Sequence, residues 1–120
     1  MATILVVEDT PGNLALVTKL LTAAGHQVLA AGTGAEGIVA AQESRPDLVL
    51  MDLGLPDMAG WEALEQIKAD PQHADLKVVA FTAHAMVGDR ERALQSGFDG
   101  YLSKPIDVAT FASDVAALVP

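Results

Sequence analysis

Short runs of valine, isoleucine and leucine alternate along the chain with longer segments in which apolar residues recur every three or four positions. The short runs predict strands, and the longer segments predict amphipathic helices. The strands are expected at residues 4–7, 28–31, 48–51, 78–81 and, from a weaker pattern, 100–102. The first four runs hardly alternate between apolar and polar residues, so we expect these strands to be buried on both faces.

A helix is predicted after each strand. The first has an apolar stripe and ends at Gly25, a suitable C-terminal cap; the stripe is Leu14, Val17, Leu20, Leu21 and Ala24. The next three are expected at residues 35–44, 61–69 and 87–96. Gly37 lies inside the second of these, where it allows close approach to the sheet. The stripe of the last helix is Val108, Phe111, Val115 and Leu118.

Five strand–helix units account for all 120 residues. This alternation predicts an α/β fold, a doubly wound parallel sheet with right-handed crossovers. We expect a single domain over residues 1–120, since no stretch reads as a linker or a low-complexity tail. Pro120 directly follows the last predicted helix, so either a stand-alone protein or a domain of a larger one is compatible with the sequence.

The composition excludes several classes of protein. A formal net charge of -9 and an isoelectric point near 4.4, with the seven basic residues scattered, argue against binding to nucleic acid or to an anionic membrane surface. Without cysteine there is no disulfide, thiolate metal site or cysteine nucleophile. No apolar run is long enough to span a membrane, and the N-terminus lacks the pattern of a signal peptide, so we expect a cytoplasmic protein.

Polar residues follow four of the predicted strands, and the carboxyl ends of parallel strands share one edge of the sheet, where ligands bind. These residues are Glu8, Asp9, Asp52, Thr82, Ser103 and Lys104. Three carboxylates and one lysine leave a charge that a divalent cation would balance. Oxygen ligands suit Mg²⁺, which leaves room for a phosphoryl oxygen. Taken singly, such acids are more often helix caps or turn formers.

The sequence resembles the receiver domain of two-component response regulators, the CheY-like superfamily, over essentially its whole length. The matching stretches are "VVED" at 6–9, "PDLVLMDLGLPDMAG" at 46–60, "VVAFTAHA" at 78–85 and "GYLSKPI" at 100–106. The resemblance implies a flavodoxin-like fold with strand order 2-1-3-4-5. "TAHAMVGDRERAL" is similar to the corresponding stretch of DivK-type single-domain regulators and of receivers in hybrid histidine kinases.

The resemblance also implies a function. Asp52 would accept a phosphoryl group from the phosphohistidine of a sensor histidine kinase or a histidine phosphotransfer protein. Glu8, Asp9, the Asp52 side chain and the backbone carbonyl of Gly54 would hold Mg²⁺, or Mn²⁺ in its place. Lys104 would pair with the phosphoryl oxygens.

A conformational switch is implied as well. Thr82 would move to hydrogen-bond the phosphoryl group, and Tyr101 would follow it inward. This movement would alter the surface of the fourth helix, fifth strand and fifth helix for a downstream effector protein. The bond from Lys104 to Pro105 would be cis and would aim the lysine into the site. The protein would be a monomer or a weak, phosphorylation-linked dimer, a signalling switch rather than a turnover enzyme.

Two other functions remain open. A small aspartate-nucleophile phosphotransferase or phosphatase would act on an external substrate, but such enzymes usually have a second acid two residues after the nucleophile, where this chain has Gly54. A flavodoxin-like electron carrier would need a hydroxyl-rich phosphate loop, whereas the first loop is the acidic "EDTPGN". His26, His73 and His84 do not have the spacing of metal ligands.

Overall fold

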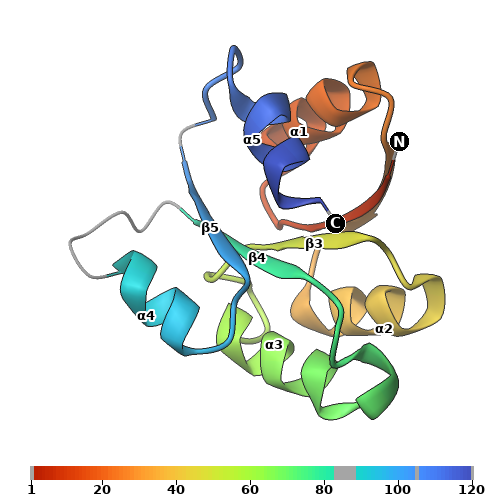
Figure 1. Ribbon diagram of the computed structural model, residues 1–120, viewed down its shortest axis with the longest axis vertical. Coiled ribbons are helices and arrows are strands. Elements are labelled where there is room, and N and C mark those ends of the chain that lie inside the picture. The colour runs from red at the N-terminus through yellow and green to blue at the C-terminus, as the bar shows by residue number, and fades with distance from the viewer. Residues whose placement is uncertain (1, 83–88, 105, 120) are drawn as a thin grey trace.

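The computed structural model describes residues 2–82, 89–104 and 106–119. It contains one five-stranded parallel sheet in the order β2-β1-β3-β4-β5 (Figure 1). The strands are β1 Thr3–Val7, β2 Gln27–Ala31, β3 Leu48–Met51, β4 Val78–Thr82 and β5 Gly100–Ser103. The helices are α1 Pro11–Ala23, α2 Gly34–Ser44, α3 Gly60–Ala69, α4 Asp89–Gln95 and α5 Phe111–Leu118, with a short 3₁₀ helix, η1, at Pro71–His73. The predicted doubly wound fold and strand order are confirmed.

The chain reverses its direction of travel across the sheet between β1 and β3. From β1 it runs outward to β2, then returns to β3 on the other side of β1 and continues through β4 to β5. With right-handed crossovers, this reversal places α1 and α5 on one face and α2, α3 and α4 on the other (Figure 1). The carboxyl ends of β1 and β3 therefore form the switch point at which such sheets bind ligands.

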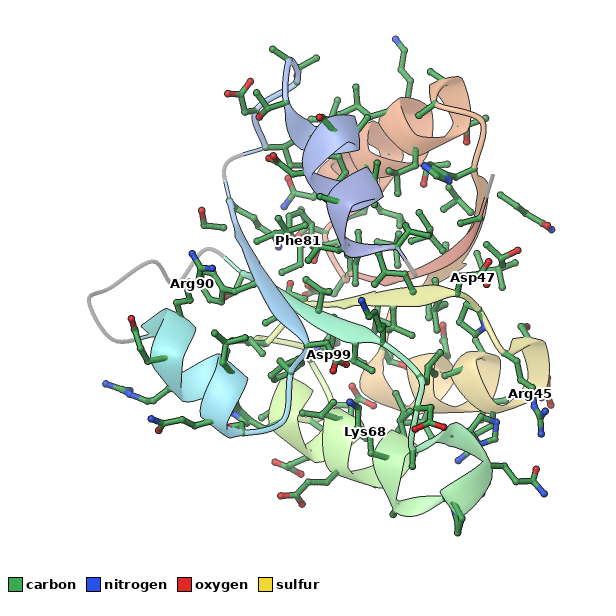
Figure 2. All side chains as sticks on the ribbon, viewed as in Figure 1. Arg45, Asp47, Lys68, Phe81, Arg90 and Asp99 are labelled. Carbon is green, nitrogen blue, oxygen red and sulfur yellow. The ribbon has the colours of Figure 1, made fainter. Side chains whose placement is uncertain are left out.

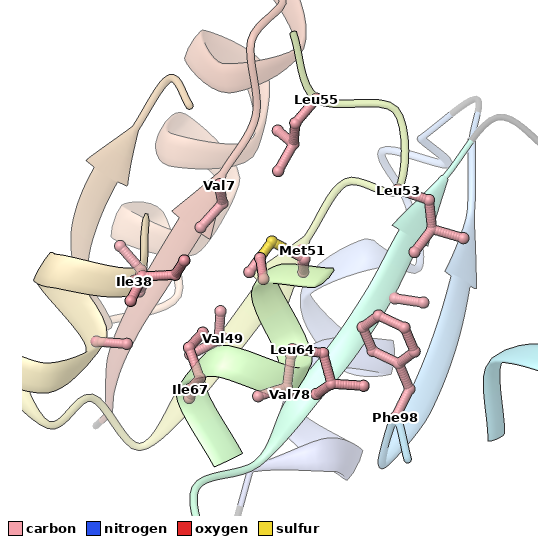
Figure 3. Packing of buried hydrophobic residues seen from close by; sticks show 14 of the residues in the cluster. Val7, Ile38, Val49, Met51, Leu53, Leu55, Leu64, Ile67, Val78 and Phe98 are labelled. Carbon is pink, nitrogen blue, oxygen red and sulfur yellow. The ribbon is translucent and has the colours of Figure 1, made fainter. Parts of the chain in front are cut away.

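Alternate residues of the central strands pack into two hydrophobic cores. Leu5 and Val7 of β1 face the core under α2 and α3, whereas Ile4 and Val6 face the core under α1 and α5. Every residue of β3 and β4 is buried. Figure 3 shows the first core, where Val49 and other strand residues meet the apolar faces of α2 and α3. The strands are thus held rigidly up to their carboxyl ends.

Two expectations from the sequence are wrong. β2 is an edge strand in which only Ala31 is buried, so its unbroken apolar run does not reflect burial on both faces. The last helix begins at Phe111, and Val108 lies ahead of it with 61% of its surface exposed. Val108 keeps helical spacing from Phe111 in the sequence, but residues 107–110 form a turn in which the Phe111 amide bonds the Asp107 carbonyl.

Glycines allow close contacts at two points near the switch point. A Cβ on Gly37 would lie 2.7 Å from Cγ2 of Val7, so glycine lets α2 lie against β1 as predicted. A Cβ on Gly60 would lie 2.7 Å from the backbone oxygen of Asp52.

The predicted cap at Gly25 is also confirmed, since this residue follows α1 with φ +92°. Among the described residues, no helix is long and apolar enough to cross a membrane.

Candidate functional site

Backbone hydrogen bonds fix the acids that follow β1 and β3. The Glu8 amide donates to the carbonyl of Ala31 at 2.9 Å, and the Asp52 amide donates to that of Val7 at 3.0 Å. Each bond extends the ladder of the sheet by one residue beyond the strand. The backbone that carries these side chains is therefore as ordered as the strands themselves.

Lys104 reaches the acids from the end of β5. Its amide donates to the Thr82 carbonyl at 2.8 Å, and its Nζ donates to Glu8 Oε1 at 2.5 Å and to Asp52 Oδ2 at 3.1 Å. Nζ also lies 5.0 Å from the ring centroid of Phe81, the β4 residue labelled in Figure 2, which adds a cation–π contact. One ammonium group thus joins two carboxylates in a site that is largely shielded from water.

Three carboxylates converge beside this lysine. Glu8, Asp9 and Asp52 each offer an oxygen, and these oxygens lie within 4.8 Å of one another. Glu8 Oε2 is buried and has no hydrogen-bond partner in the described part of the chain. A buried carboxylate oxygen without a partner is costly, so the site favours a ligand that accepts its lone pair. Clustered carboxylate oxygens are the donors that hard divalent cations prefer, and the cluster can hold one.

The two buried acids titrate differently. Burial raises the pKa of Glu8 above its ordinary value, and the neighbouring Asp52 raises it further. Burial also disfavours ionised Asp52, but the polar contact with Glu8 and the hydrogen bonds from the Gly54 amide and Lys104 outweigh it and lower the Asp52 pKa. For Lys104, burial lowers the pKa, yet its two acidic partners more than offset this and raise it. Asp52 is therefore an anion and Lys104 a cation at neutral pH.

The loop from β3 to α3 closes on itself next to Asp52. The Gly54 amide donates to Asp52 Oδ1 at 3.1 Å, and Gly54 forms an isolated bridge with Ala59. The Gly60 amide donates to the Leu53 carbonyl at 3.0 Å. Gly54 itself is exposed and has no side chain that could cover the loop next to Asp52.

The comparison with protein families decides what kind of domain this is. A model of the response regulator receiver domain matches residues 4–116. The chain belongs to this family. Its members act as phosphoaccepting signalling domains that interact with histidine kinases and effectors.

Known receivers resemble the chain over nearly all of its length. The polar-differentiation response regulator DivK of Brucella anthropi is 39% identical over 112 residues, which cover 93% of this chain and 91% of that protein. The receiver of sensor histidine kinase PA1611 from Pseudomonas aeruginosa, solved with magnesium in the active site cleft, has a TM-score of 0.87 at 33% identity, covering 98% of this chain and 96% of the other. The Mn²⁺-bound response regulator Rcp1 has a TM-score of 0.79 at 25% identity, covering 98% and 91%.

The remaining predicted residues of this receiver domain lie on β4 and β5. Thr82 is completely buried at the end of β4, and its carbonyl joins the Lys104 backbone. Tyr101 is half-buried on β5, pairs in register with Ala80 and packs against the core under α3. A hollow of about 360 Å³ adjoins it; its lining is Arg90, Tyr101, Leu102, Ser103, Ile106, Asp107, Phe111 and Asp114.

Some predictions fall outside the described residues. These concern the expected cis peptide bond to Pro105 and the expectation that His84 is not a metal ligand. The other two histidines have structural contacts: His26 Nδ1 accepts from the Ala2 amide at 3.1 Å, and His73 Nε2 lies 3.2 Å from the Gln42 carbonyl. The described residues that form the acidic cluster include neither of them.

Sequence reasoning missed the contacts of two residues near the candidate site. Phe81 was assigned to a buried strand, and nothing in the local pattern indicates that its ring lies beneath the Lys104 ammonium. The sequence predicts no role for Asp57, yet its carboxylate accepts hydrogen bonds from amides at the start of α2. An acid after proline in a loop is a cue for capping, but its partner is 22 or 23 residues earlier in the chain.

Proposed function

We propose that this receiver works as a phosphorylation switch in which Asp52 takes a phosphoryl group from the phosphohistidine of a sensor histidine kinase or a histidine phosphotransfer protein. The observation that carries the proposal is the contact between Lys104 Nζ and Asp52 Oδ2 at 3.1 Å, on a carboxylate that faces two further acids. A nucleophile with a cation on one side and metal-binding oxygens on the other suits phosphoryl transfer, because this chemistry depends on positioning and charge stabilisation.

The transfer step uses the charge states already described. An Asp52 carboxylate oxygen attacks phosphorus, an O–P bond forms, and the N–P bond breaks with its electron pair returning to the imidazole nitrogen. The lowered pKa of Asp52 keeps the nucleophile deprotonated at neutral pH. The Lys104 ammonium would then pair with the phosphoryl oxygens, and the Thr82 hydroxyl would donate to one of them.

The proposed cation is Mg²⁺, and Mn²⁺ is the alternative. Glu8, Asp9, the Asp52 side chain and the Gly54 carbonyl would hold it. A bound divalent ion would neutralise the charge that gathers on the carboxylate and phosphoryl oxygens. The magnesium in the PA1611 receiver and the Mn²⁺ in Rcp1 support this choice.

The proposed output is a population shift at the surface of α4, β5 and α5. Thr82 would draw Tyr101 inward when the phosphoryl group arrives, which would reshape the adjoining hollow for a downstream effector. We propose a cytoplasmic protein whose phosphorylation at most drives weak dimerisation. In this role residues 1–120 act as a single switch and not as a turnover enzyme.

Intact-mass spectrometry after incubation with acetyl phosphate and Mg²⁺ tests the proposal. We expect one added phosphoryl group, which EDTA or the Asp52→Asn substitution abolishes. Asp47→Asn is the matched control, because it changes an acid beside the other end of β3 and should leave the modification intact. An unmodified wild-type protein, or full modification of the Asp52→Asn variant, would contradict the assignment.

A turnover assay separates the switch from the phosphatase alternative. The absence of a side chain at Gly54 removes the second acid that such enzymes use to protonate a leaving group. We therefore expect no catalytic release of phosphate from p-nitrophenyl phosphate. Sustained multiple turnovers that depend on Asp52 would favour the enzyme.

A further inference from the structure

Asp57 joins the β3–α3 loop to the first turn of α2. Its Oδ1 accepts a hydrogen bond from the Gly34 amide at 2.7 Å, and its Oδ2 accepts one from the Ala35 amide at 3.0 Å. The first amides of a helix have no partner within the helix, and a carboxylate there is also favoured by the helix dipole. These hydrogen bonds lower the pKa of Asp57, so it is ionised at neutral pH.

This contact is additional to an ordinary cap. The N-cap of α2 is Thr33, whose side chain accepts from the Glu36 amide at 3.1 Å. Thr33 is adjacent to α2 in the chain, whereas Asp57 comes from the loop that carries Asp52 and Gly54. The start of α2 is therefore bound by one local side chain and by one from the candidate site.

The loop and the helix also meet at Gly34. A Cβ on this residue would lie 2.7 Å from Met58 Sδ and 3.3 Å from Asp57 Oδ1. A side chain at this position would crowd the Met58 side chain and the Asp57 carboxylate. The paired hydrogen bonds of Asp57 and the contact of Met58 with Gly34 thus bring the loop onto α2.

α2 is in turn fixed to the strand that carries the other acids. Gly37 lies against Val7, the last residue of β1, and Glu8 and Asp9 follow directly. One helix therefore contacts both the residue that precedes Glu8 and Asp9 and the loop that carries Gly54. The base of that loop is closed by the bridge between Gly54 and Ala59, and Asp57 lies on the segment between these two residues.

We infer that Asp57 is a positioning residue of the cation site, which holds the Gly54 carbonyl in place relative to Glu8 and Asp9 by binding the β3–α3 loop to α2. The inference rests on the proposed function, in which these residues bind Mg²⁺. Asp57 does not touch the cation. It restricts the conformations of the β3–α3 loop in advance, so less conformational entropy is lost when the metal binds.

The test is a Mg²⁺ titration of ¹⁵N-labelled variants followed by amide NMR shifts. Asp57→Ala should weaken Mg²⁺ binding about tenfold, at the lower end of the range for residues that orient metal ligands. Thr33→Ala is the matched control: it removes a cap from the same helix and should leave the Mg²⁺ affinity unchanged. Asp57→Asn keeps one carbonyl acceptor and should fall between wild type and Asp57→Ala.

Gly34→Ala tests the same contact while leaving Asp57 in place. A Cβ there crowds the Met58 side chain and the Asp57 carboxylate and so loosens the contact between the loop and α2. The variant should therefore also bind Mg²⁺ more weakly, and it serves where Asp57→Ala does not fold. Wild-type affinity in both variants overturns the inference. So does an equal loss in Thr33→Ala and Asp57→Ala, which would make Asp57 only a helix cap.

The proposed function can fail separately. A wild-type protein that neither binds Mg²⁺ nor takes a phosphoryl group from acetyl phosphate overturns both the function and the inference. Normal phosphorylation of the wild type, with no effect of Asp57→Ala or Gly34→Ala on Mg²⁺ binding, overturns the inference alone.

Discussion

The two edges of the sheet use the same kind of residue for opposite purposes. At the amino-terminal edge, Asp47 lies directly before β3 and accepts from the Thr3 amide at the start of β1, at 2.8 Å. Asp99 lies directly before β5 and accepts from the Val78 amide at the start of β4, at 2.9 Å, and also binds Lys68. Figure 2 labels Asp47, Asp99 and Lys68. Each acid there joins two neighbouring strands.

At the carboxyl-terminal edge the acids face one another. Glu8 and Asp52 share Lys104, Asp9 lies beside them, and one oxygen of Glu8 has no partner among the described residues. All these acids lie next to a strand, so neither residue type nor position distinguishes them. The hydrogen-bond partners do: an acid bonded to backbone amides stabilises the fold, whereas acids that face one another form a site for a cation. Replacing an acid at the amino-terminal edge should therefore lower the stability of the fold, whereas replacing the buried Glu8 at the carboxyl-terminal edge should raise it in the absence of metal.

The largest effect is expected at the amino-terminal edge. Asp99→Ala leaves the Val78 amide without its acceptor and removes the contact with Lys68, so the free energy of unfolding should fall by about 2 kcal/mol. Urea denaturation monitored by circular dichroism measures this. Asp75→Ala, at an exposed acid in the turn after η1, is the control and should change stability little. Equal stability of both variants would show that Asp99 does not hold the strands together.

The second largest effect on stability is expected from Mg²⁺ binding at the carboxyl-terminal edge. Mg²⁺ at ten times its Kd should raise the free energy of unfolding by about 1.4 kcal/mol, because only the folded protein offers the assembled cluster. Asp9→Asn should lose most of this gain. Differential scanning calorimetry with MgCl₂, against NaCl of equal ionic strength, measures it. The same gain in both salts would indicate screening of the net negative charge and not a site.

The third effect is a gain in stability from removing an acid. In metal-free buffer at pH 7, Glu8→Gln should stabilise the fold by about 1 kcal/mol, since a buried carboxylate in a cluster of like charges is unfavourable and Lys104 keeps Asp52 as its partner. The folded pKa of Glu8 is raised. Its contribution to stability is therefore fully present below its unfolded pKa and is lost as pH rises through the folded pKa.

The pH dependence of the stability difference between Glu8→Gln and wild type tests this prediction. The advantage of Glu8→Gln over wild type should be absent below the ordinary glutamate value of 4.5 and should grow as the pH rises above it. Chemical denaturation of both proteins across this range measures the difference. A variant that is less stable than wild type at pH 7 would show that the Glu8 contact with Lys104 outweighs the cost of burial.

The carboxyl-terminal acids could be predicted from the sequence because each directly follows an apolar run. A strand end in the sequence is a strand end in space, and parallel strands bring such ends to one edge. The partly exposed β2 and the exposed Val108 could not be predicted. Apolar spacing records which residues are compatible with burial, whereas the edge position of β2 and the turn ahead of Phe111 determine what is buried.

Contacts between segments distant in sequence also escaped the prediction. Asp57 binds amides at the start of α2, and the partners of Asp47 and Asp99 are 44 and 21 residues away. A cap within one helix has a local signature, as Thr33 has with Glu36, because the chain itself sets the spacing. A carboxylate that caps a different element has no such spacing, and only the packed structure reveals it.

Asp57 tests the comparison between the two edges of the sheet, with the smallest expected effect. It lies near the carboxyl-terminal edge but binds backbone amides, as the acids at the other edge do. The amides of Ala35 and Gly34 lower its pKa, so the contact should persist above the unfolded value and be lost as pH falls through the folded pKa. NMR shifts of these two amides should therefore titrate together, with a midpoint below the ordinary aspartate value of 3.8. In Asp57→Asn that titration should disappear. If it persists there, another acid governs these amides, and Asp57 does not belong with the acids that join one element to another.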